Sequence, residues 1–370
     1  MLFTSVWHAG RDDGMEGIVR QVKRAAFFIR AGAWIGAGLM LLGAGGATRA
    51  TALAQGDAGV WGERADMVVP RSEMAIAELN GRIYALGGYP GIRITSTDVQ
   101  VYDPAADVWS LGAPLPLPLH HSMAASVDGR LYVIGGEGGD PGPGGLGFQD
   151  RVYMLDEAAG AWVPRASMLT ARSGGGAAVI DGKIYVAGGR PPRGADFAVY
   201  DPAADSWTTL PDVPTQRNHL GVVAIDGRVF VAGGRFGGGV GSEMTDVLEI
   251  YDPRTDAWTR GAPLPAPRAG LASVAANGCL YAVGGEGNDA DPRGIFDRNE
   301  LYDPGTDSWR SLAPMPLPTH GLTGAAYLDG WVHIPGGATR RGVSGPDVTV
   351  KHQVFRADAT CGGPVAEANE

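Results

Sequence analysis

The chain has 370 residues, of which 59 are glycine and 26 are proline, so turns must be frequent. The hydrophobic fraction of 44% and the charged fraction of 19% are those of a globular chain, which excludes collagen, a coiled coil and low-complexity disorder. The net charge of -10 argues against nucleic acid or an anionic membrane as a partner held by bulk charge.

The N-terminal segment has the order of a signal peptide. Four basic residues between positions 20 and 30 precede an uncharged run over 31–47, which is followed by the small residues Ala52-Leu53-Ala54. The run is rich in glycine and short for a membrane-spanning helix. We predict that residues 1–54 are a signal peptide cleaved after Ala54, with an uncleaved N-terminal anchor as the alternative. The protein is then exported, and is periplasmic, secreted or at the cell surface.

A glycine pair recurs six times along the rest of the chain, with a mean spacing of about 50 residues. The pairs occupy positions 87–88, 135–136, 188–189, 233–234, 284–285 and 336–337. Each pair ends a strand-like run, with an aromatic residue three positions before it in five repeats and His333 in the sixth. A turn such as Asn80-Gly81 precedes the run, which predicts a β-hairpin. A loop of variable length, Tyr-Asp-Pro and a tryptophan follow, as in Tyr102 and Trp109.

This double glycine followed by tyrosine and tryptophan resembles the kelch repeat, and the resemblance covers residues 58–360. It implies an all-β fold, a six-bladed kelch β-propeller with four antiparallel strands in each blade. The sixth repeat ends after Val354-Phe355 without a tryptophan, whereas an unpartnered tryptophan strand surrounds Trp61. We therefore expect an N-terminal outer strand around Trp61 to close the ring. The propeller is assigned to residues 55–360 and a C-terminal tail to residues 361–370.

One face of such a propeller carries both the loops that join the blades and the loops that follow each second strand, so we expect function there. Sixteen residues before each first glycine lie Arg71, Leu119, Arg172, Arg217, Arg268 and His320. The next position holds Ser72, His120, Ser173, Asn218, Ala269 and Gly321. The one after it holds Glu73, His121, Gly174, His219, Gly270 and Leu322. The residues that follow the glycine pairs are Tyr89, Glu137, Arg190, Arg235, Glu286 and Ala338.

These positions predict an arginine-rimmed channel mouth. Arginine offers a planar fork of donors that suits carboxylate or phosphate, and several arginines facing one concavity focus a positive potential. The predicted ligand-binding residues are Arg71, Ser72, His120, His121, Glu137, Arg172, Ser173, Arg190, Arg217, His219, Arg235, Arg268, Glu286 and His320. We expect a monomer that binds an anionic small molecule, glycan or acidic peptide without a cofactor and without chemistry. The alternative for each arginine is an internal bond to a neighbouring carbonyl or aspartate.

Four glycine-rich loops on this face are candidate lids over the mouth. They span residues 138–150, 236–246, 287–299 and 339–348.

Two groups of kelch proteins suggest what the mouth binds. In eukaryotic kelch propellers that recruit partners, arginines and serines near this rim grip acidic peptides. Similar motif positions here hold Arg71, Ser72, Arg172, Ser173, Arg190 and Arg217. The chain also resembles the exported six-bladed kelch proteins of bacteria, which include sialic acid mutarotase. That resemblance implies an acid and a base near the sugar ring oxygen and a cation for its carboxylate, so a sugar-acid mutarotase is the alternative function.

His121 and His219 share one ring position two blades apart, so we expect them to face each other across the channel. Since no third histidine occupies that position, we expect a hydrogen-bonded pair and no metal. The resemblance to galactose oxidase, another kelch protein, is poor, because that enzyme has seven blades. The sequence has no Gly-x-Ser-x-Gly, phosphate-loop, His-Glu-x-x-His or Cys-x-x-Cys motif.

Cys279 and Cys361 are the only cysteines. Cys279 begins the second strand of the fifth repeat and Cys361 follows the third strand of the sixth, so both belong near the face opposite the mouth. An exported location permits a disulfide between them, and two unpaired thiols are the alternative.

Overall fold

The computed structural model describes residues 58–91, 94–138, 147–342 and 345–362. Within these ranges the regular structure consists of β-strands and one short 3-10 helix, η1 (Gly345–Asp347). The predicted N-terminal leader, residues 1–54, lies outside the described residues, as do residues 363–370 of the predicted tail. Among the described residues no helix has the length and apolar character needed to cross a membrane.

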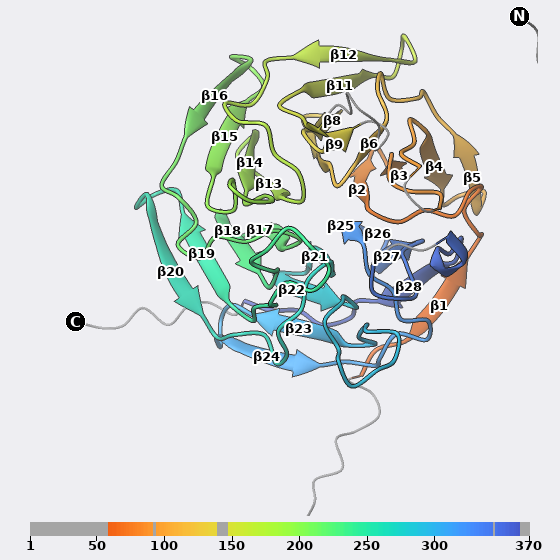
Figure 1. The fold of residues 1–370 in the computed structure, drawn as a ribbon, viewed down its shortest axis with the longest axis vertical. Helices are drawn as coiled ribbons and strands as arrows, with labels where there is room; N and C mark the ends of the chain where they lie inside the picture. Colours follow the sequence, from red (N-terminus) through yellow and green to blue (C-terminus); the bar gives the residue numbers. More distant parts are fainter. Residues whose placement is uncertain (1–57, 92–93, 139–146, 343–344, 363–370) are drawn as a thin grey trace, which may run out of the picture. The chain divides into compact units, whose positions relative to one another are not determined.

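Six blades, each with four antiparallel strands, surround a central axis in the described part of the chain, which confirms the kelch β-propeller (Figure 1). From inner to outer strand, blade one has β2 (Met74–Leu79), β3 (Arg82–Leu86), β4 (Val99–Asp103) and β5 (Val108–Leu111), and blade two has β7 (Met123–Val127), β8 (Arg130–Ile134), β11 (Val152–Asp156) and β12 (Ala161–Arg165). Blade three has β13 (Gly176–Ile180), β14 (Lys183–Ala187), β15 (Phe197–Asp201) and β16 (Ser206–Thr209), and blade four has β17 (Gly221–Ile225), β18 (Arg228–Ala232), β19 (Leu248–Asp252) and β20 (Ala257–Gly261). Blade five has β21 (Ala272–Ala276), β22 (Cys279–Val283), β23 (Asn299–Asp303) and β24 (Ser308–Ser311), and blade six has β26 (Ala326–Leu328), β27 (Trp331–Pro335), β28 (His352–Arg356) and β1 (Trp61–Arg64).

Three short strands form a further sheet on the mouth side of blade two. They are β6 (Leu119–His120), β9 (Glu137–Gly138) and β10 (Gly147–Phe148). A two-residue strand, β25 (Leu322–Thr323), pairs in parallel with β2 and links blade six to blade one.

The repeat motifs position the blades. Tyr102 packs on Trp109 with ring centroids 5.3 Å apart and donates its hydroxyl to Asp107 at 2.7 Å, and three other blades repeat the tyrosine–aspartate bond. The indole of Trp162 donates to the carbonyl of Ala113 in the chain leaving blade one, at 2.9 Å. A Cβ on Gly87 would lie 2.2 Å from the carbonyl oxygen of Leu119, so the glycine allows the next loop to approach. The apolar core lies between neighbouring blades.

The N-terminal strand closes the ring as predicted. Strand β1 pairs with β28 along its whole length, from Trp61 opposite Phe355 to Arg64 opposite His352. The indole of Trp61 donates to the carbonyl of Ala313 at 2.8 Å, the same bond that other motif tryptophans make to the preceding blade.

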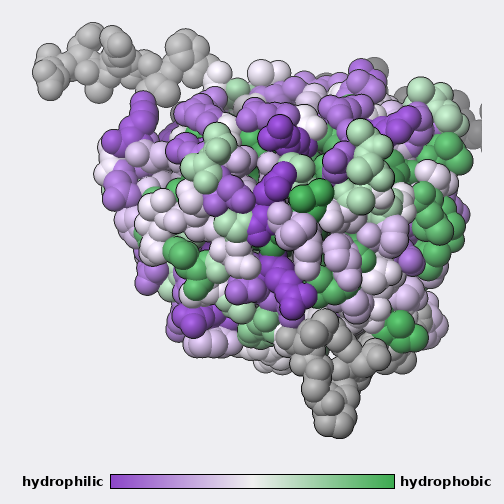
Figure 2. All heavy atoms as spheres, turned by 90° about the horizontal axis from the view of Figure 1, so that it is seen from above, coloured by the Kyte–Doolittle hydropathy of each residue, from purple (hydrophilic) through white to green (hydrophobic). Residues whose placement is uncertain are grey.

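On the edge of the ring, hydrophilic side chains lie among smaller hydrophobic areas (Figure 2).

The predicted disulfide is present. Cys279 and Cys361 are bonded, with their Sγ atoms 2.11 Å apart. The bond ties the segment after β28 to β22, and the backbone N–H of Cys361 donates to the carbonyl of Asn277 at 2.9 Å. The C-terminal segment of blade six is therefore fastened to blade five.

Two histidines are buried between blades six and one. His333 lies in β27, and its Nδ1 is 3.0 Å from Nε2 of His352 in β28. Burial, with a smaller contribution from the charge of Arg64, lowers the pKa of His333 to about 4. Burial, with smaller contributions from His333 and Arg64, lowers the pKa of His352 well below its ordinary value. Both rings are therefore neutral in the folded protein at neutral pH.

We expect the free energy of unfolding to fall as the pH drops from about 6.5 toward about 4. In this range the histidines of the unfolded chain become protonated, whereas the buried histidines of the folded chain do not. His333 alone accounts for a loss on the order of 3 kcal/mol across that window. His333→Tyr, which restores the tyrosine of the equivalent position in blade one, should flatten the pH dependence. Urea unfolding between pH 4 and 8 measures the slope, and equal slopes for the two chains would contradict the assignment.

Candidate functional site

A closed ring of backbone hydrogen bonds encircles the axis at the mouth. Each member donates its N–H to the carbonyl of the member in the preceding blade loop, with N···O distances from 2.5 to 3.0 Å. The members, which we call the mouth ring, are Glu73, His121, Gly174, His219, Gly270 and Gly321. All six have a positive φ, between 51° and 78°. At this level the opening of the channel is bounded by the side chains of the ring members that are not glycine.

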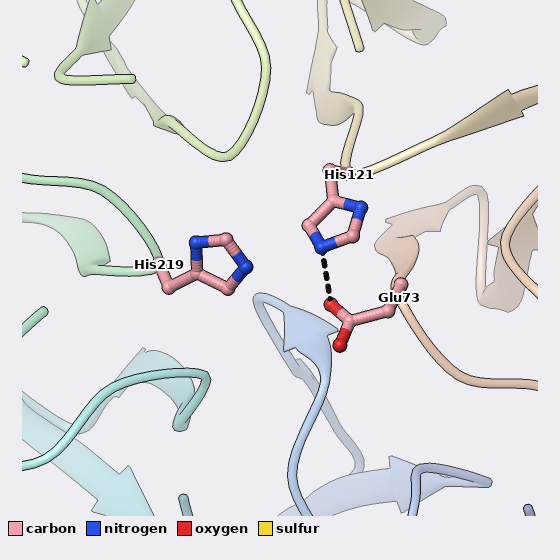
Figure 3. A group of neighbouring side chains, drawn as sticks. All are labelled: Glu73, His121 and His219. Atoms are coloured by element: carbon pink, nitrogen blue, oxygen red, sulfur yellow. Dashed lines mark ion pairs between the residues drawn. The ribbon is translucent and has the colours of Figure 1, made fainter. Parts of the chain in front are cut away.

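Three members of the mouth ring are not glycine. A left-handed backbone costs a residue with a Cβ about 1–2 kcal/mol, and glycine at the other three positions avoids that cost. The side chains of Glu73, His121 and His219 all point toward the axis (Figure 3). One possible ligand atom from each lies within 4.8 Å of the others. Strained residues that converge in this way indicate a functional site.

A chain of hydrogen bonds leads from Glu73 outward to the rim. Nε2 of His121 is 3.0 Å from Oε2 of Glu73, and Nδ1 of His121 is 2.5 Å from Nδ1 of His120. Nε2 of His120 is 2.8 Å from the hydroxyl of Tyr89, whose ring stacks on the imidazole with centroids 4.4 Å apart. These contacts link the mouth ring to Tyr89.

The tautomer of His219 follows from its neighbours. Asn218 donates its side-chain amide to the carbonyls of Arg235 and Gly237, so its Oδ1 faces His219 as an acceptor. Nδ1 of His219 lies 2.5 Å from that oxygen and therefore carries the proton. Nε2 is left as an acceptor, and Nη2 of Arg235 donates to it at 2.9 Å. Arg235 also forms a buried ion pair with Glu286.

Burial and charge set the protonation of this group. Burial would raise the pKa of Glu73, yet the attraction and hydrogen bond of His121 hold it well below the ordinary value, with smaller contributions from His219 and His320. Burial lowers the pKa of His219 well below its ordinary value, and the charge of Arg235 adds to this. Burial, followed by the charge of His121, lowers the pKa of His120 to about 2. Glu73 is thus an anion, and His120 and His219 are neutral.

Arg190 is the most exposed of the six arginines predicted to bind the ligand. Its side chain is 20% exposed, and its Nη1 lies 3.5 Å from Oε2 of Glu137, which is itself 28% exposed. Its Nη2 lies 3.1 Å from Nε2 of His121. Its Nε is buried and has no hydrogen-bond partner among the described residues. Arg190 therefore presents part of its side chain at the mouth, between a carboxylate and an imidazole.

Four predicted ligand-binding arginines instead serve the fold, which corrects the expectation of an arginine-rimmed mouth. The side chains of Arg71, Arg172, Arg217 and Arg268 are at most 1% exposed. Arg217 and Arg268 pair with Glu249 and Glu300, each at 2.6 Å, and Arg71 pairs with Asp98 at 2.9 Å. Arg172 donates to the carbonyls of Val186 and Asp196. These arginines fix the loops between blades through internal bonds to carboxylates and carbonyls, which was the alternative prediction for them.

The other predicted residues divide between the mouth and its supporting layer. Ser72 and Ser173 are fully buried beside the mouth ring, and each Oγ lacks a hydrogen-bond partner among the residues described. Glu286 and His320 are also buried, with Nδ1 of His320 3.9 Å from Glu286 and its Nε2 2.7 Å from the carbonyl of Arg340. The residues brought together at the mouth are His120, His121, Glu137, Arg190, His219, Arg235, Glu286 and His320.

Blade six departs by one residue from the predicted register. The sequence count aligned His320 with the buried arginines, but the N–H of Gly285 donates to the carbonyl of Thr319, as that of Gly234 donates to Arg268. His320 instead pairs with Ala338, as Asn218 pairs with Arg235. The inner strand of blade six is broken between β25 and β26, which adds one residue there. For the same reason the sixth member of the mouth ring is Gly321 and not Leu322.

Sequence reasoning missed three features that have a signal in the sequence. Arg217 and Arg268 each precede their partner glutamate by 32 residues, and this repeated spacing indicates an internal pair. Tyr89 was placed on the rim but not among the binding residues. Glu73 was placed at the same ring position as the two histidines, but only histidines were counted there as metal ligands.

Parts of the candidate lids contact one another. The N–H of Arg341 donates to the carbonyl of Arg293 at 2.7 Å, and its guanidinium pairs with Asp289 at 3.1 Å. Residues 139–146 and 343–344 of these loops lie outside the described residues. That the loops act as lids stays a prediction.

Two spaces lie along the axis. A cavity of about 10 Å³ is lined by Glu73, His121 and His219 together with ring glycines. A wider channel of about 390 Å³ follows on the other side of the ring and is lined by the inner strands, including Ala124 and Ser273. The small cavity has room for a single water molecule or ion.

The sequence matches the model of the KLHDC2/KLHL20/DRC7 Kelch-repeats domain over residues 63–234 and again over residues 120–337. Kelch-like ECH-associated protein 1B of Danio rerio is 38% identical over 103 residues, which are 27% of this chain and 17% of that protein. Kelch-like protein terF of Aspergillus terreus is 36% identical over 94 residues, 25% of this chain and 20% of that protein. The matched segments are thus about a fifth of the length of these relatives.

A solved structure described as "Structure of YjhT" superposes with a TM-score of 0.65. The alignment covers 78% of this chain and 95% of that chain at 18% identity, so the two share a fold. Because the kelch family model covers well over half of the sequence and six blades carry the repeat motifs, the chain belongs to the kelch-repeat family of β-propellers.

Proposed function

We propose that this protein is an exported kelch propeller that binds a small carboxylated ligand, of the sugar-acid class, at its channel mouth. The observation that carries the proposal is Arg190, whose side chain is 20% exposed at the mouth. A carboxylate accepts two parallel hydrogen bonds from such a group. Of the six arginines predicted to bind the ligand, Arg190 is the one that is more than 5% exposed and can therefore reach a ligand from the mouth.

Two features support the exported location. The N-terminal residues have the order of a signal peptide. The disulfide between Cys279 and Cys361 suits an oxidising compartment, because cytosolic thiols are kept reduced.

Arg190→Met should weaken binding of N-acetylneuraminate about 10- to 100-fold, since it removes charge-assisted hydrogen bonds worth about 1.5–3 kcal/mol. Isothermal titration calorimetry at low salt measures the change. Arg193→Met is the matched control, because Arg193 lies in the same loop and is 44% exposed with a distant partner, Asp196, at 3.9 Å. Equal losses in both variants, or none in either, would remove Arg190 from the site.

A second candidate function is mutarotation of the same ligand. Glu137 and His121 contact the two Nη atoms of Arg190, so a carboxylate held there lies between a possible base and a possible acid. The base would take the proton of the anomeric hydroxyl while the acid protonates the ring oxygen, which opens the ring. Glu73 and His120 orient His121.

Proton NMR of freshly dissolved N-acetylneuraminate distinguishes binding from mutarotation. A mutarotase accelerates the equilibration of the anomers, and Glu137→Gln should slow it at least 100-fold, the scale of general acid–base catalysis, while the sugar still binds. Anomer equilibration at the rate of buffer alone would leave binding as the function.

A further inference from the structure

The three strained members of the mouth ring share a chemical property. Glutamate and histidine are ordinary ligands of transition metals, whereas the remaining three ring positions hold glycine, which is suited to that backbone. A site built only for structure would accept glycine at every position. The ring thus tolerates strain at the three places whose side chains meet on the axis.

The geometry is that of an open three-ligand site. The three ligand atoms lie within 4.8 Å of one another, and the Glu73–His121 distance is already 3.0 Å. Ligands held at 2.0–2.2 Å from a zinc ion are about 3.3 Å apart, so a small rotation of the His219 side chain completes the triangle. The cavity of about 10 Å³ that these residues line suits one ion.

The neighbouring residues orient both imidazoles. His219 donates Nδ1–H to Asn218, which leaves Nε2 as the ligand atom. His121 uses Nδ1 toward His120, so its Nε2 also faces the cavity. Such bonds to the second nitrogen fix the tautomer and the direction of metal-binding histidines.

The carboxylate of Glu73 gives the ligand set itself a negative charge. The mouth holds three carboxylates, from Glu73, Glu137 and Glu286, against the guanidinium groups of Arg190 and Arg235. A bound ion would replace the hydrogen bond that Arg235 donates to Nε2 of His219 and the contact between Arg190 and Nε2 of His121. Each arginine would keep its carboxylate partner.

We propose that Glu73, His121 and His219 bind a single divalent transition metal ion, with zinc as the ion that this ligand set fits best. Two imidazoles and one carboxylate are a zinc set that leaves the fourth position open. The expectation of no metal rested on the lack of a third histidine, and Glu73 supplies the third ligand. An ion there would present its open position to a ligand at the mouth.

Calorimetric titration of the chelator-treated full chain with zinc alone tests the site without any sugar. We expect one zinc per chain with a dissociation constant in the micromolar range or tighter. His121→Gly and His219→Gly should each weaken zinc binding at least 100-fold, because each removes one of the three ligands. His333→Tyr is the control, since His333 is a buried histidine outside the ring, and it should bind zinc normally.

Cobalt(II) gives a second measurement on the unaltered chain, in case a ring variant fails to fold. Visible absorption bands of four-coordinate cobalt that saturate at one equivalent would support the site. Zinc affinity weaker than 100 µM, or equal zinc binding by the two ring variants and the unaltered chain, would overturn it. Because the probe is the metal alone, these outcomes are independent of whether a sugar acid binds.

Discussion

Arg217→Met should lower the free energy of unfolding by about 3–5 kcal/mol, the largest effect that we expect from a single substitution. Arg217 is fully buried, and its guanidinium bonds to Glu249 at 2.6 Å and to the carbonyls of Gly233, Thr215 and Val231. Its removal leaves the buried carboxylate of Glu249 without its main counter-charge. Methionine fills part of the volume but replaces none of these bonds.

Urea unfolding followed by circular dichroism measures the loss. Arg254→Met is the matched control in the same blade, because Arg254 is 82% exposed, and it should change stability by less than about 1 kcal/mol. Adding Glu249→Gln to Arg217→Met should recover part of the loss, since the orphaned charge disappears. A loss as small as that of the control would mean that Arg217 is not needed by the fold.

Loss of the disulfide is the second large effect. Replacing both Cys279 and Cys361 by serine should lower the free energy of unfolding by about 4 kcal/mol, because the bond closes a loop with a sequence separation of 82 residues in the unfolded chain. The fastened segment follows β28, which pairs with the closing strand β1. Opening should therefore begin at blade six.

Comparing amide hydrogen exchange in blade six with that in blade three shows whether loss of the disulfide destabilises blade six alone or the whole propeller. Faster exchange confined at first to β28 and β1 would agree with the role given to the disulfide. Labelling of both sulfurs by an alkylating reagent without reductant would show that the bond is absent and would contradict the prediction.

The repeat made most of the fold predictable. Glycine pairs, the tyrosine and the tryptophan are local signals that each blade must satisfy, so six copies predict six blades. The closing strand could be predicted because repeat six lacks its tryptophan and an additional tryptophan, Trp61, precedes the first repeat. The one-residue shift in blade six was not predictable by counting, because the extra residue lies in the broken inner strand before β26.

The site was predictable only as a region. Equal spacing brought His121 and His219 to one ring as expected, but spacing does not say which way a side chain turns. Arg71 and Arg190 both occupy repeat positions that were predicted to lie near the rim. The side chain of Arg71 is buried between blades, whereas that of Arg190 lies at the mouth. That choice depends on carboxylates such as Asp98, which lie in other parts of the repeat.

A crystal structure of the protein with N-acetylneuraminate tests the proposed function most directly. We predict that the sugar carboxylate lies about 3 Å from the guanidinium nitrogens of Arg190, with Glu137 beside it. A sugar bound in the channel between the inner strands, or elsewhere on the ring with Arg190 still facing His121, would contradict the proposal.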